Sequence, residues 1–232
     1  IIAISEQQKL DLTRKYKICS EDKVAIIPLG FNLNRFQENK LQKRIDFREE
    51  YKIKANEVAI GIIGRLVPIK NHKLFIDAIK QLEIKSTYKI RAFIFGDGSS
   101  SEELKAYTKN AGVSFVNGDF ISGKTATIHF TSWIKDIDKV NAGMDIIALC
   151  SLNEGTPVSL IEAQASGKPV VSTKVGGVSN IIRPNETGFL VENNSLPEFT
   201  NSLLKLVEDE QLRIKMGELG WDNVHEKFHY TR

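Results

Sequence analysis

The feature that most constrains the fold is a regular alternation of short apolar runs with amphipathic segments. Apolar runs such as VAIGIIG at residues 58–64, KIRAFIF at 89–95 and MDIIALCS at 144–151 are separated by helical patterns such as HKLFIDAIKQLE at 72–83 and SEELKAYTKNAG at 101–112. Continuous apolar strands between amphipathic helices are typical of a parallel sheet that is covered on both faces. The sequence therefore predicts an α/β fold with a doubly wound parallel sheet.

Charge and composition limit the classes of partner. The chain has 232 residues and a net charge of +3, with Lys and Glu interspersed along it. Because no basic block stands out, we expect no nucleic-acid partner. The two cysteines, Cys19 and Cys150, lie far apart in dissimilar contexts, so we expect neither a disulfide framework nor a cysteine metal site, and a reducing cytoplasm fits. No apolar run approaches the roughly 20 residues that span a bilayer.

Three parts of different character divide the chain. It opens on IIAIS, a β-prone apolar run without an initiator methionine, so residues 1–28 look like the remnant of a longer protein. Turn-forming residues follow, and we read 29–56 as a linker with a connecting helix. Residues 57–232 then carry the main domain. Within it, 113–130 contains Asn-Gly and Ser-Gly pairs, for which we expect a β-hairpin or a flexible excursion.

The stretch SLNEGTPVSLIEAQASGKPVV at 151–171 contains the clearest helix start in the chain. Thr156 is the expected N-cap, Pro157 the first helical residue, and Gly167 follows an end at Ser166. Since the helix follows an apolar strand through a short loop, its N-terminus should lie at the carboxyl edge of the sheet, where ligands of such folds bind. Free N–H groups and the helix dipole favour an anion there, especially phosphate.

Two carboxylates flank this helix start, Glu154 in the loop and Glu162 on the helix. Glu162 shares a face with Ser159 and lies roughly 8 Å from the helix start, a reach comparable to that between a pyrophosphate and its ribose. Glu162 could therefore accept hydrogen bonds from ribose hydroxyls. The alternative is structural: Glu154 would complement the helix dipole and Glu162 would pair with a Lys or Arg. The pattern alone leaves both open.

A second motif, GIIGRLVPIKN at 61–71, places two cations after a buried strand. Gly64 permits a close backbone approach, and Arg65 and Lys70 could hold a diphosphate, Arg65 through its planar fork and Lys70 as a point charge. The motif is neither a dinucleotide fingerprint nor a Walker A loop. Two solvated charges on a turn remain the alternative.

Other candidates are weaker. Asp97 in the GDG run at 96–98 could bind a hydroxyl, although a capped helix start at 99–103 is the simpler reading, and the Gly176-Gly177 loop also lies at the expected ligand edge. The histidines show no metal-binding spacing. His225 and His229, four residues apart, are expected to be exposed on a late helix, and no metal site is predicted.

Taken together, these motifs resemble the C-terminal donor-binding domain of the retaining GT-B glycosyltransferases, a group that includes bacterial capsule, lipopolysaccharide and mannosyl transferases. The resemblance covers nearly the whole chain, and it is carried by Gly64, Arg65 and Lys70, by the GDG run, by the stretch from Phe130 to Ile182, and by NETGFLV at 185–191. It implies that this chain is one half of a GT-B architecture, in which two Rossmann-like domains face each other across a cleft.

The resemblance also implies roles for individual residues. Arg65 and Lys70 would hold the donor diphosphate without a metal, Glu154 would contact the transferred sugar and Glu162 the ribose. Trp133 and Ile134 would line the nucleobase pocket. The residues implied in donor binding are Gly64, Arg65, Lys70, Trp133, Ile134, Glu154, Thr156, Pro157, Val158, Ser159 and Glu162; Arg65, Lys70 and Glu154 are also implied in catalysis.

The implied reaction is transfer of a hexosyl group, with retention, from a UDP- or GDP-linked sugar to a glycan or lipid-linked acceptor in bacterial surface polysaccharide synthesis. No cofactor is implied, and the enzyme would work in the cytoplasm with peripheral association at the inner face of the cell membrane. Residues 1–28 resemble only the last elements of the N-terminal acceptor domain. We therefore expect this chain to bind donor without transferring sugar. The alternatives are a sugar-nucleotide epimerase of the same fold and a non-catalytic nucleotide-binding module.

Overall fold

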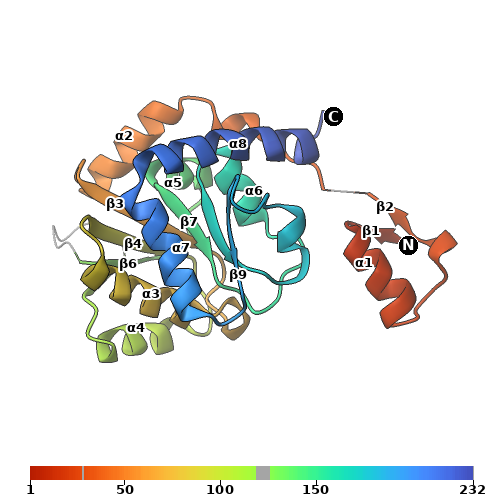
Figure 1. Ribbon diagram of the computed structural model, residues 1–232, viewed down its shortest axis with the longest axis horizontal. Helices are drawn as coiled ribbons and strands as arrows, with labels where there is room; N and C mark the ends of the chain where they lie inside the picture. The colour runs from red at the N-terminus through yellow and green to blue at the C-terminus, as the bar shows by residue number, and fades with distance from the viewer. Residues whose placement is uncertain (28, 119–125, 232) are drawn as a thin grey trace.

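The computed structural model describes residues 1–27, 29–118 and 126–231, and its main body is built on one parallel sheet (Figure 1). Within the described residues the sheet has seven strands in the order β5-β6-β4-β3-β7-β8-β9. The strands are β3 (Glu57–Ile63), β4 (Lys89–Phe95), β5 (Phe115–Asn117), β6 (Ile128–Thr131), β7 (Ile146–Leu149), β8 (Val170–Thr173) and β9 (Gly188–Val191). The predicted α/β fold with a doubly wound parallel sheet is confirmed.

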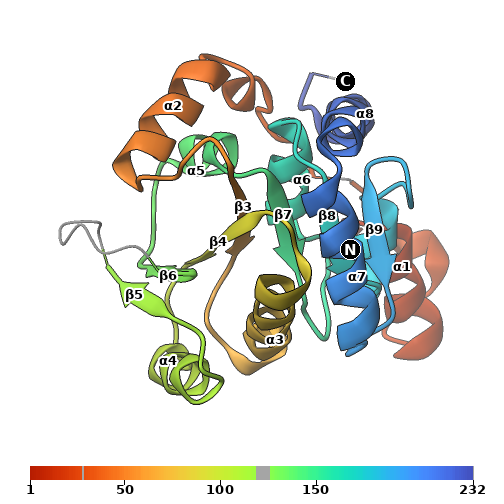
Figure 2. The same ribbon diagram turned by 60° about the vertical axis from the view of Figure 1, so that its left-hand side comes forward.

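Helices cover both faces of this sheet, as Figure 2 shows. One face carries α3 (His72–Lys85), α4 (Ser101–Asn110) and α7 (Leu196–Glu208); the other carries α2 (Lys40–Glu50), α5 (Ile137–Gly143), α6 (Val158–Ala165) and α8 (Glu210–Phe228). Alternate strand residues enter two separate cores: Ile60 and Ile62 belong to the first, and Ala59 belongs to the second. This division explains why the strands read as continuous apolar runs, since neither face is open to water.

Residues 1–27 form their own small unit, in which β1 (Ile2–Ala3) and β2 (Ala25–Ile26) pair in a separate two-stranded parallel sheet (Figure 1). Helix α1 (Glu6–Leu10) continues into a π-helical turn at Asp11–Lys15, and a short 3₁₀ turn follows at Glu21–Lys23. Further 3₁₀ turns in the chain lie at Asn34–Phe36, Pro68–Lys70 and Gly176–Asn180.

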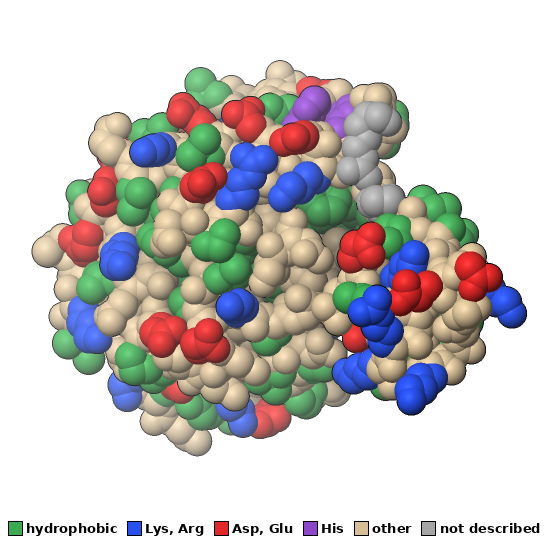
Figure 3. Space-filling model, turned by 45° about the vertical axis from the view of Figure 1, so that its right-hand side comes forward, with side chains coloured by type: hydrophobic (Ala, Val, Ile, Leu, Met, Phe, Trp, Pro, Cys, Tyr) green, Lys and Arg blue, Asp and Glu red, His purple; other side chains and the backbone are tan. Residues whose placement is uncertain are grey.

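Figure 3 shows cations and anions intermingled on one face of the molecule. The domain boundaries at 28 and 56 stay predictions.

Helix α2, which lies in the predicted linker, is tied to the main body by ion pairs. Asp145, the residue before β7, accepts hydrogen bonds from Arg44 at 2.6 Å and from Arg48 at 3.1 Å, and it also accepts the backbone N–H of Ala59 at 2.8 Å. None of the helices in the described parts of the chain combines the length and the apolar character needed to cross a membrane.

The hairpin expected at 113–130 is wrong for its described residues. β5 and β6 run parallel, with Phe115 opposite Ile128, and they extend the main sheet at its edge. The Asn-Gly pair is no hairpin turn between β5 and β6, because Gly118, which follows β5 with a φ of +78°, donates its N–H to Phe130 O at 2.9 Å and so continues the parallel pairing. Residues 119–125, which include the Ser-Gly pair, lie outside the described residues, so the predicted flexible excursion there is untested.

Candidate functional site

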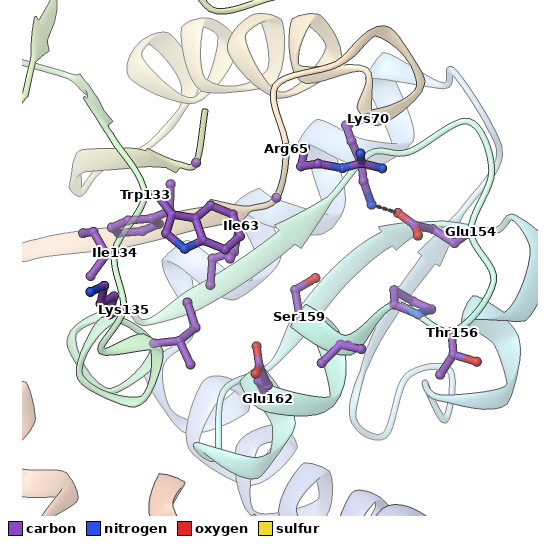
Figure 4. Close-up of a pocket in the computed structure, with 16 residues that line it drawn as sticks. Ile63, Arg65, Lys70, Trp133, Ile134, Lys135, Glu154, Thr156, Ser159 and Glu162 are labelled. Carbon is purple, nitrogen blue, oxygen red and sulfur yellow. Dashed lines mark hydrogen bonds and ion pairs between the residues drawn. The ribbon is translucent and has the colours of Figure 1, made fainter. Parts of the chain in front are cut away.

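The carboxyl ends of β3, β4, β6 and β7 surround a cavity of about 690 Å³ (Figure 4). Every residue predicted for donor binding lines it. The full lining consists of Ile63, Gly64, Arg65, Lys70, Phe95, Gly96, Trp133, Ile134, Lys135, Ile137, Glu154, Thr156, Pro157, Val158, Ser159 and Glu162. Loops that are far apart in the sequence therefore build one site, at the edge of the sheet where doubly wound folds bind ligands.

Two of these residues form an ion pair across the cavity wall. Lys70 Nζ lies 2.5 Å from Glu154 Oε1, and Ser151 Oγ donates to the same oxygen at 2.5 Å. Glu154 is therefore held both by Lys70 from the loop after β3 and by Ser151 from its own loop after β7. Figure 4 shows Lys70 and Glu154 at one end of the cavity. Both contacts involve Oε1, and no side-chain hydrogen bond caps the start of α6.

Two glycines support the loop that carries Glu154. The N–H of Gly177 donates to Glu154 O at 3.1 Å. A Cβ at Gly176, whose φ is +48°, would lie 1.9 Å from Glu154 O, and one at Gly177 would lie 1.9 Å from Gly155 O. Only glycine permits so close a backbone approach. The Gly-Gly pair therefore positions the site without lining it, a role that the sequence pattern did not show.

The helix after this loop starts later than predicted. α6 begins at Val158, and the cap position is Pro157, whose ψ of 98° is extended, so Thr156 is not the N-cap. Proline has no side-chain acceptor, and no side chain caps the helix. The other end agrees with prediction, since Ser166 is the C-cap and Gly167 follows with a φ of +66°. The uncapped first turn faces the cavity through Val158 and Ser159.

Glu162 lies deeper along α6 and has an unusual environment. Burial raises the pKa of its carboxyl to about 7, with Arg35 lowering that pKa and Asp138 raising it. No hydrogen bond or ion pair to the carboxylate of Glu162 occurs among the described residues. Instead Arg35 pairs with Asp138 at 2.7 Å, and Lys43 pairs with Asp138 at 2.8 Å. Arg35, whose charge acts on Glu162, is thus paired with Asp138, and the half-buried carboxylate of Glu162 has no ion-pair partner among the described residues.

The remaining lining differs between the two ends of the cavity. Arg65 is exposed and joins Lys70 at one end, whereas Trp133 and Ile134 form an apolar wall at the other (Figure 4). Trp133 is 65% exposed, so its indole face is open to a planar partner. The cavity is therefore lined by cations at one end and by apolar side chains at the other.

Sequence reasoning missed part of the lining, namely Ile63, Phe95, Gly96, Lys135 and Ile137. Ile63 and Phe95 are the last residues of β3 and β4, so a systematic look at strand ends finds them. Gly96 has a φ of +138°, and a Cβ there would lie 2.0 Å from Gly64 O. The first glycine of the GDG run therefore allows two strand ends to approach.

The rest of the GDG run and the start of α4 follow Gly96 in the chain, and the described side-chain contact of Asp97 is with the backbone. Asp97 accepts the N–H of Gly98 at 2.7 Å. α4 begins with Ser100 at its cap position, but no serine side chain caps it, so the expected side-chain cap is wrong.

The histidines form no metal site within the described residues, where no group of three metal-ligating side chains occurs. His225 is exposed as predicted. His229 is not, since it is only 4% exposed. It lies just past the end of α8, pairs by a bridge with Phe31 and stacks on Tyr230, which places it against the segment that leads into the main body.

Comparison with known proteins places these observations in a family. The model of the glycosyl transferases group 1 family matches residues 43–220. The chain is 28% identical over 194 residues to the Escherichia coli UDP-Gal:alpha-D-GlcNAc-diphosphoundecaprenol alpha-1,3-galactosyltransferase, covering 83% of this chain and 47% of that protein. It is 27% identical over 230 residues to the capsular polysaccharide biosynthesis glycosyltransferase CapM of Staphylococcus aureus, covering 98% and 57%. The chain spans about half the length of these curated relatives.

Solved structures share the fold. HepE of Anabaena in complex with UDP superposes with a TM-score of 0.82 at 22% identity, covering 98% of this chain and 59% of that one. The C-terminal domain of the glycosyl transferase group 1 protein LpcC from Francisella tularensis gives a TM-score of 0.71 at 28% identity, covering 87% of this chain and 100% of that domain. The predicted resemblance is confirmed: the chain belongs to the glycosyl transferases group 1 family and has the Rossmann-like fold of the C-terminal half of a GT-B glycosyltransferase.

Proposed function

We propose that the cavity binds a nucleotide-diphosphate sugar, linked to UDP or GDP, as the donor for glycosyl transfer. The observation that carries the proposal is the convergence on one cavity of two cations, an uncapped helix start and the half-buried carboxylate of Glu162. Relatives of this chain are named as glycosyltransferases, and the HepE structure was determined with UDP. A nucleotide-diphosphate sugar carries its negative charge on the diphosphate and has a flat base, which suits a cavity lined by two cations and by the apolar side chains of Trp133 and Ile134.

The diphosphate lies, in this proposal, between the two cations and the first turn of α6. Arg65 is free to form a forked contact, since no ion pair of its guanidinium occurs among the described residues. Lys70 keeps N–H donors beyond the one that it gives to Glu154. Fixed positive charge and the helix N-terminus stabilise the negative charge that develops on the departing diphosphate, which is electrostatic catalysis without a metal.

The sugar and the nucleoside take the two ends. Glu154, beside Lys70, accepts hydrogen bonds from hydroxyls of the transferred sugar, while backbone N–H groups from Thr156 to Ser159 contact sugar and phosphates. Glu162, farther along α6, accepts from the ribose, and its lack of a described protein partner supports that role. The base packs against Trp133 and Ile134. The proposed order of sugar, ribose and base follows the order in which Glu154, Glu162 and Trp133 lie along the cavity in Figure 4.

The longer protein, we propose further, transfers the hexosyl group with retention to a glycan or lipid-linked acceptor in bacterial surface polysaccharide synthesis, in the cytoplasm at the membrane face. Relatives act in such syntheses, as the names of the E. coli and S. aureus proteins state. Residues 1–28 then belong to the acceptor domain and 29–56 connect it to the donor domain. On this proposal the present chain binds donor and does not transfer sugar.

A thermal-shift panel tests donor binding. UDP-glucose, UDP-galactose, UDP-N-acetylglucosamine and GDP-mannose are each added to the chain, with free glucose and inorganic pyrophosphate as controls. A ligand at about 100 times its Kd adds roughly 2.7 kcal/mol of stability, which corresponds to a Tm increase of about 5 °C or more for a chain of this size. The proposal fails if none of the sugar nucleotides raises Tm above the controls. Product analysis with the longer protein then separates transfer from epimerisation of the donor.

A further inference from the structure

The carboxylate of Glu154 is anchored through one of its two oxygens. Oε1 accepts both Lys70 Nζ and Ser151 Oγ, each at 2.5 Å, whereas no hydrogen bond to Oε2 occurs among the described residues. The side chain of Glu154 is only 10% exposed and lines the cavity. Oε2 is therefore the oxygen that remains for a ligand in the cavity, and its direction depends on how Oε1 is held.

Ser151 supplies the rigid part of this anchor. Its side chain is fully buried behind the cavity wall and is not part of the lining. The residue lies two positions past the end of β7, and its carbonyl oxygen accepts Thr173 Oγ1 from β8 at 2.6 Å. Two neighbouring strands thus fix the backbone of Ser151, and the short side chain transmits that position to Glu154.

Lys70 alone gives a weaker constraint. An ammonium group is a point charge at the end of a flexible chain, and it follows a carboxylate that rotates. The buried hydroxyl of Ser151 sits on a short side chain whose backbone is bonded to β8, so it cannot follow, and rotation of Glu154 breaks the bond to Ser151. We propose that Ser151 is a positioning residue for recognition of the transferred sugar: it orients Glu154 so that Oε2 meets the sugar hydroxyls.

The inference rests on the proposed function and makes a selective prediction. Ser151→Ala leaves Arg65, Lys70 and Glu162 unchanged, so affinity for a bare nucleoside diphosphate should stay the same within about twofold. Affinity for the sugar nucleotide should fall about tenfold, the usual effect of losing a hydrogen bond to a charged group. A merely structural role of the buried serine would lower both affinities together.

The experiment is calorimetric titration of the 232-residue chain with two ligand pairs, UDP-glucose with UDP and GDP-mannose with GDP. The matched control is Ser166→Ala, which removes another fully buried serine hydroxyl, one without a hydrogen-bond partner in the described structure. Glu154→Gln and the Ser151→Ala/Glu154→Gln double variant complete a mutant cycle. If Ser151 acts through Glu154, the serine substitution has little further effect once Glu154 is replaced.

The outcomes are distinct. A fall in sugar-nucleotide affinity alone, absent in Ser166→Ala and lost in the Glu154→Gln background, supports the inference. Equal losses for both members of a pair, or no loss, overturn it while leaving the proposed function intact. Wild-type protein that binds UDP-glucose no more tightly than UDP, and GDP-mannose no more tightly than GDP, also overturns it. If the wild-type chain binds no ligand of either pair, the proposed function itself fails, and the inference fails with it.

Discussion

Lys70 Nζ lies 2.5 Å from Glu154 Oε1 and joins the loop after β3 to the loop after β7. The two side chains are 21% and 10% exposed, so the pair is partly shielded from solvent. Because an ammonium group has three donors, Lys70 can keep this contact and still meet an anion in the cavity. The pair thus connects the part of the cavity proposed for the sugar with the part proposed for the diphosphate.

Removing either cation of the site should weaken diphosphate binding. We expect Lys70→Met and Arg65→Gln each to lower UDP affinity roughly tenfold by calorimetry, since each removes a charge-assisted contact. The loss should shrink as salt is raised. Lys73→Met is the matched control, because Lys73 pairs with Glu103 outside the cavity. An equal loss in Lys73→Met would mean that overall charge, and not the site, attracts the nucleotide.

Binding of a sugar nucleotide should depend on pH through Glu162. Burial raises the pKa of this carboxyl to about 7 in the free protein. Ribose hydroxyls donate best to the ionised carboxylate, so affinity should rise as the pH increases from 6 to 8, by up to about tenfold. Arg35 and Asp138 are the charged groups that act on Glu162.

The control for this pH dependence is Glu162→Gln. At pH 8 its affinity for the sugar nucleotide should be lower than that of the wild type, and that affinity should change little between pH 6 and 8. Sugar nucleotides are the right probes, because bare UDP has a terminal phosphate that titrates in the same range. An unchanged pH profile in Glu162→Gln would contradict the assignment of the ribose contact.

The Gly-Gly loop should be intolerant of a methyl group. Gly177→Ala places a Cβ 1.9 Å from Gly155 O, so the loop that carries Glu154 must move. We expect a loss of about 1–3 kcal/mol in the free energy of unfolding together with weaker sugar-nucleotide binding. Gly155→Ala is the stability control, because its Cβ meets nothing within 4 Å. Urea unfolding that finds the two variants equally stable would show that the close approach is not restrictive.

Asp145 should contribute to stability without affecting the site directly. Burial by itself raises the pKa of its carboxyl, but Arg44, Arg48 and the N–H of Ala59 outweigh burial and hold that pKa below the usual value of 3.8. Asp145→Asn leaves two guanidinium groups without their partner, which should cost about 3 kcal/mol at pH 7.

The pH dependence of this effect follows from the sign of the shift. A depressed pKa stabilises the fold above pH 3.8, and that contribution is lost as the pH falls through the folded-state value. The difference between wild type and Asp145→Asn in urea unfolding should therefore shrink in acid. Asp46→Asn, on the exposed side of α2, is the control. A difference that is the same at pH 7 and in acid would exclude the ion pairs as its cause.

Much of the fold could be predicted because its signal is local. Strands such as β3 are buried on both faces, so residues 58–63 are all apolar, and the helices between the strands show one apolar face. The hairpin at 113–130 failed because an Asn-Gly pair reports only a local bend, whereas the pairing of β5 with β6 depends on contacts across the sheet edge. His229 failed for a similar reason, since the bridge to Phe31 is a tertiary contact.

The site was predictable where residue type alone carries the chemistry. Arg65, Lys70 and Glu154 stand out as charges on loops after strands, Glu162 stands out as a charge on a mostly apolar helix, and all four line the cavity. Ser151 and the Gly176-Gly177 pair could not be assigned roles, because their contacts with the Glu154 loop depend on tertiary geometry. Thr156 was assigned as the N-cap from its type, but the extended backbone of Pro157 delays the helix.

The most direct test of the proposed donor site is calorimetric titration of the chain and of Glu162→Gln with UDP-glucose and GDP-mannose at pH 8. We predict one binding site per wild-type chain for one of these ligands and an affinity at least tenfold lower in the variant, because the ribose loses a charged acceptor. Absence of binding to the wild-type chain, or equal affinity of the two proteins, would contradict the proposal that this cavity holds a nucleotide sugar with its ribose on Glu162.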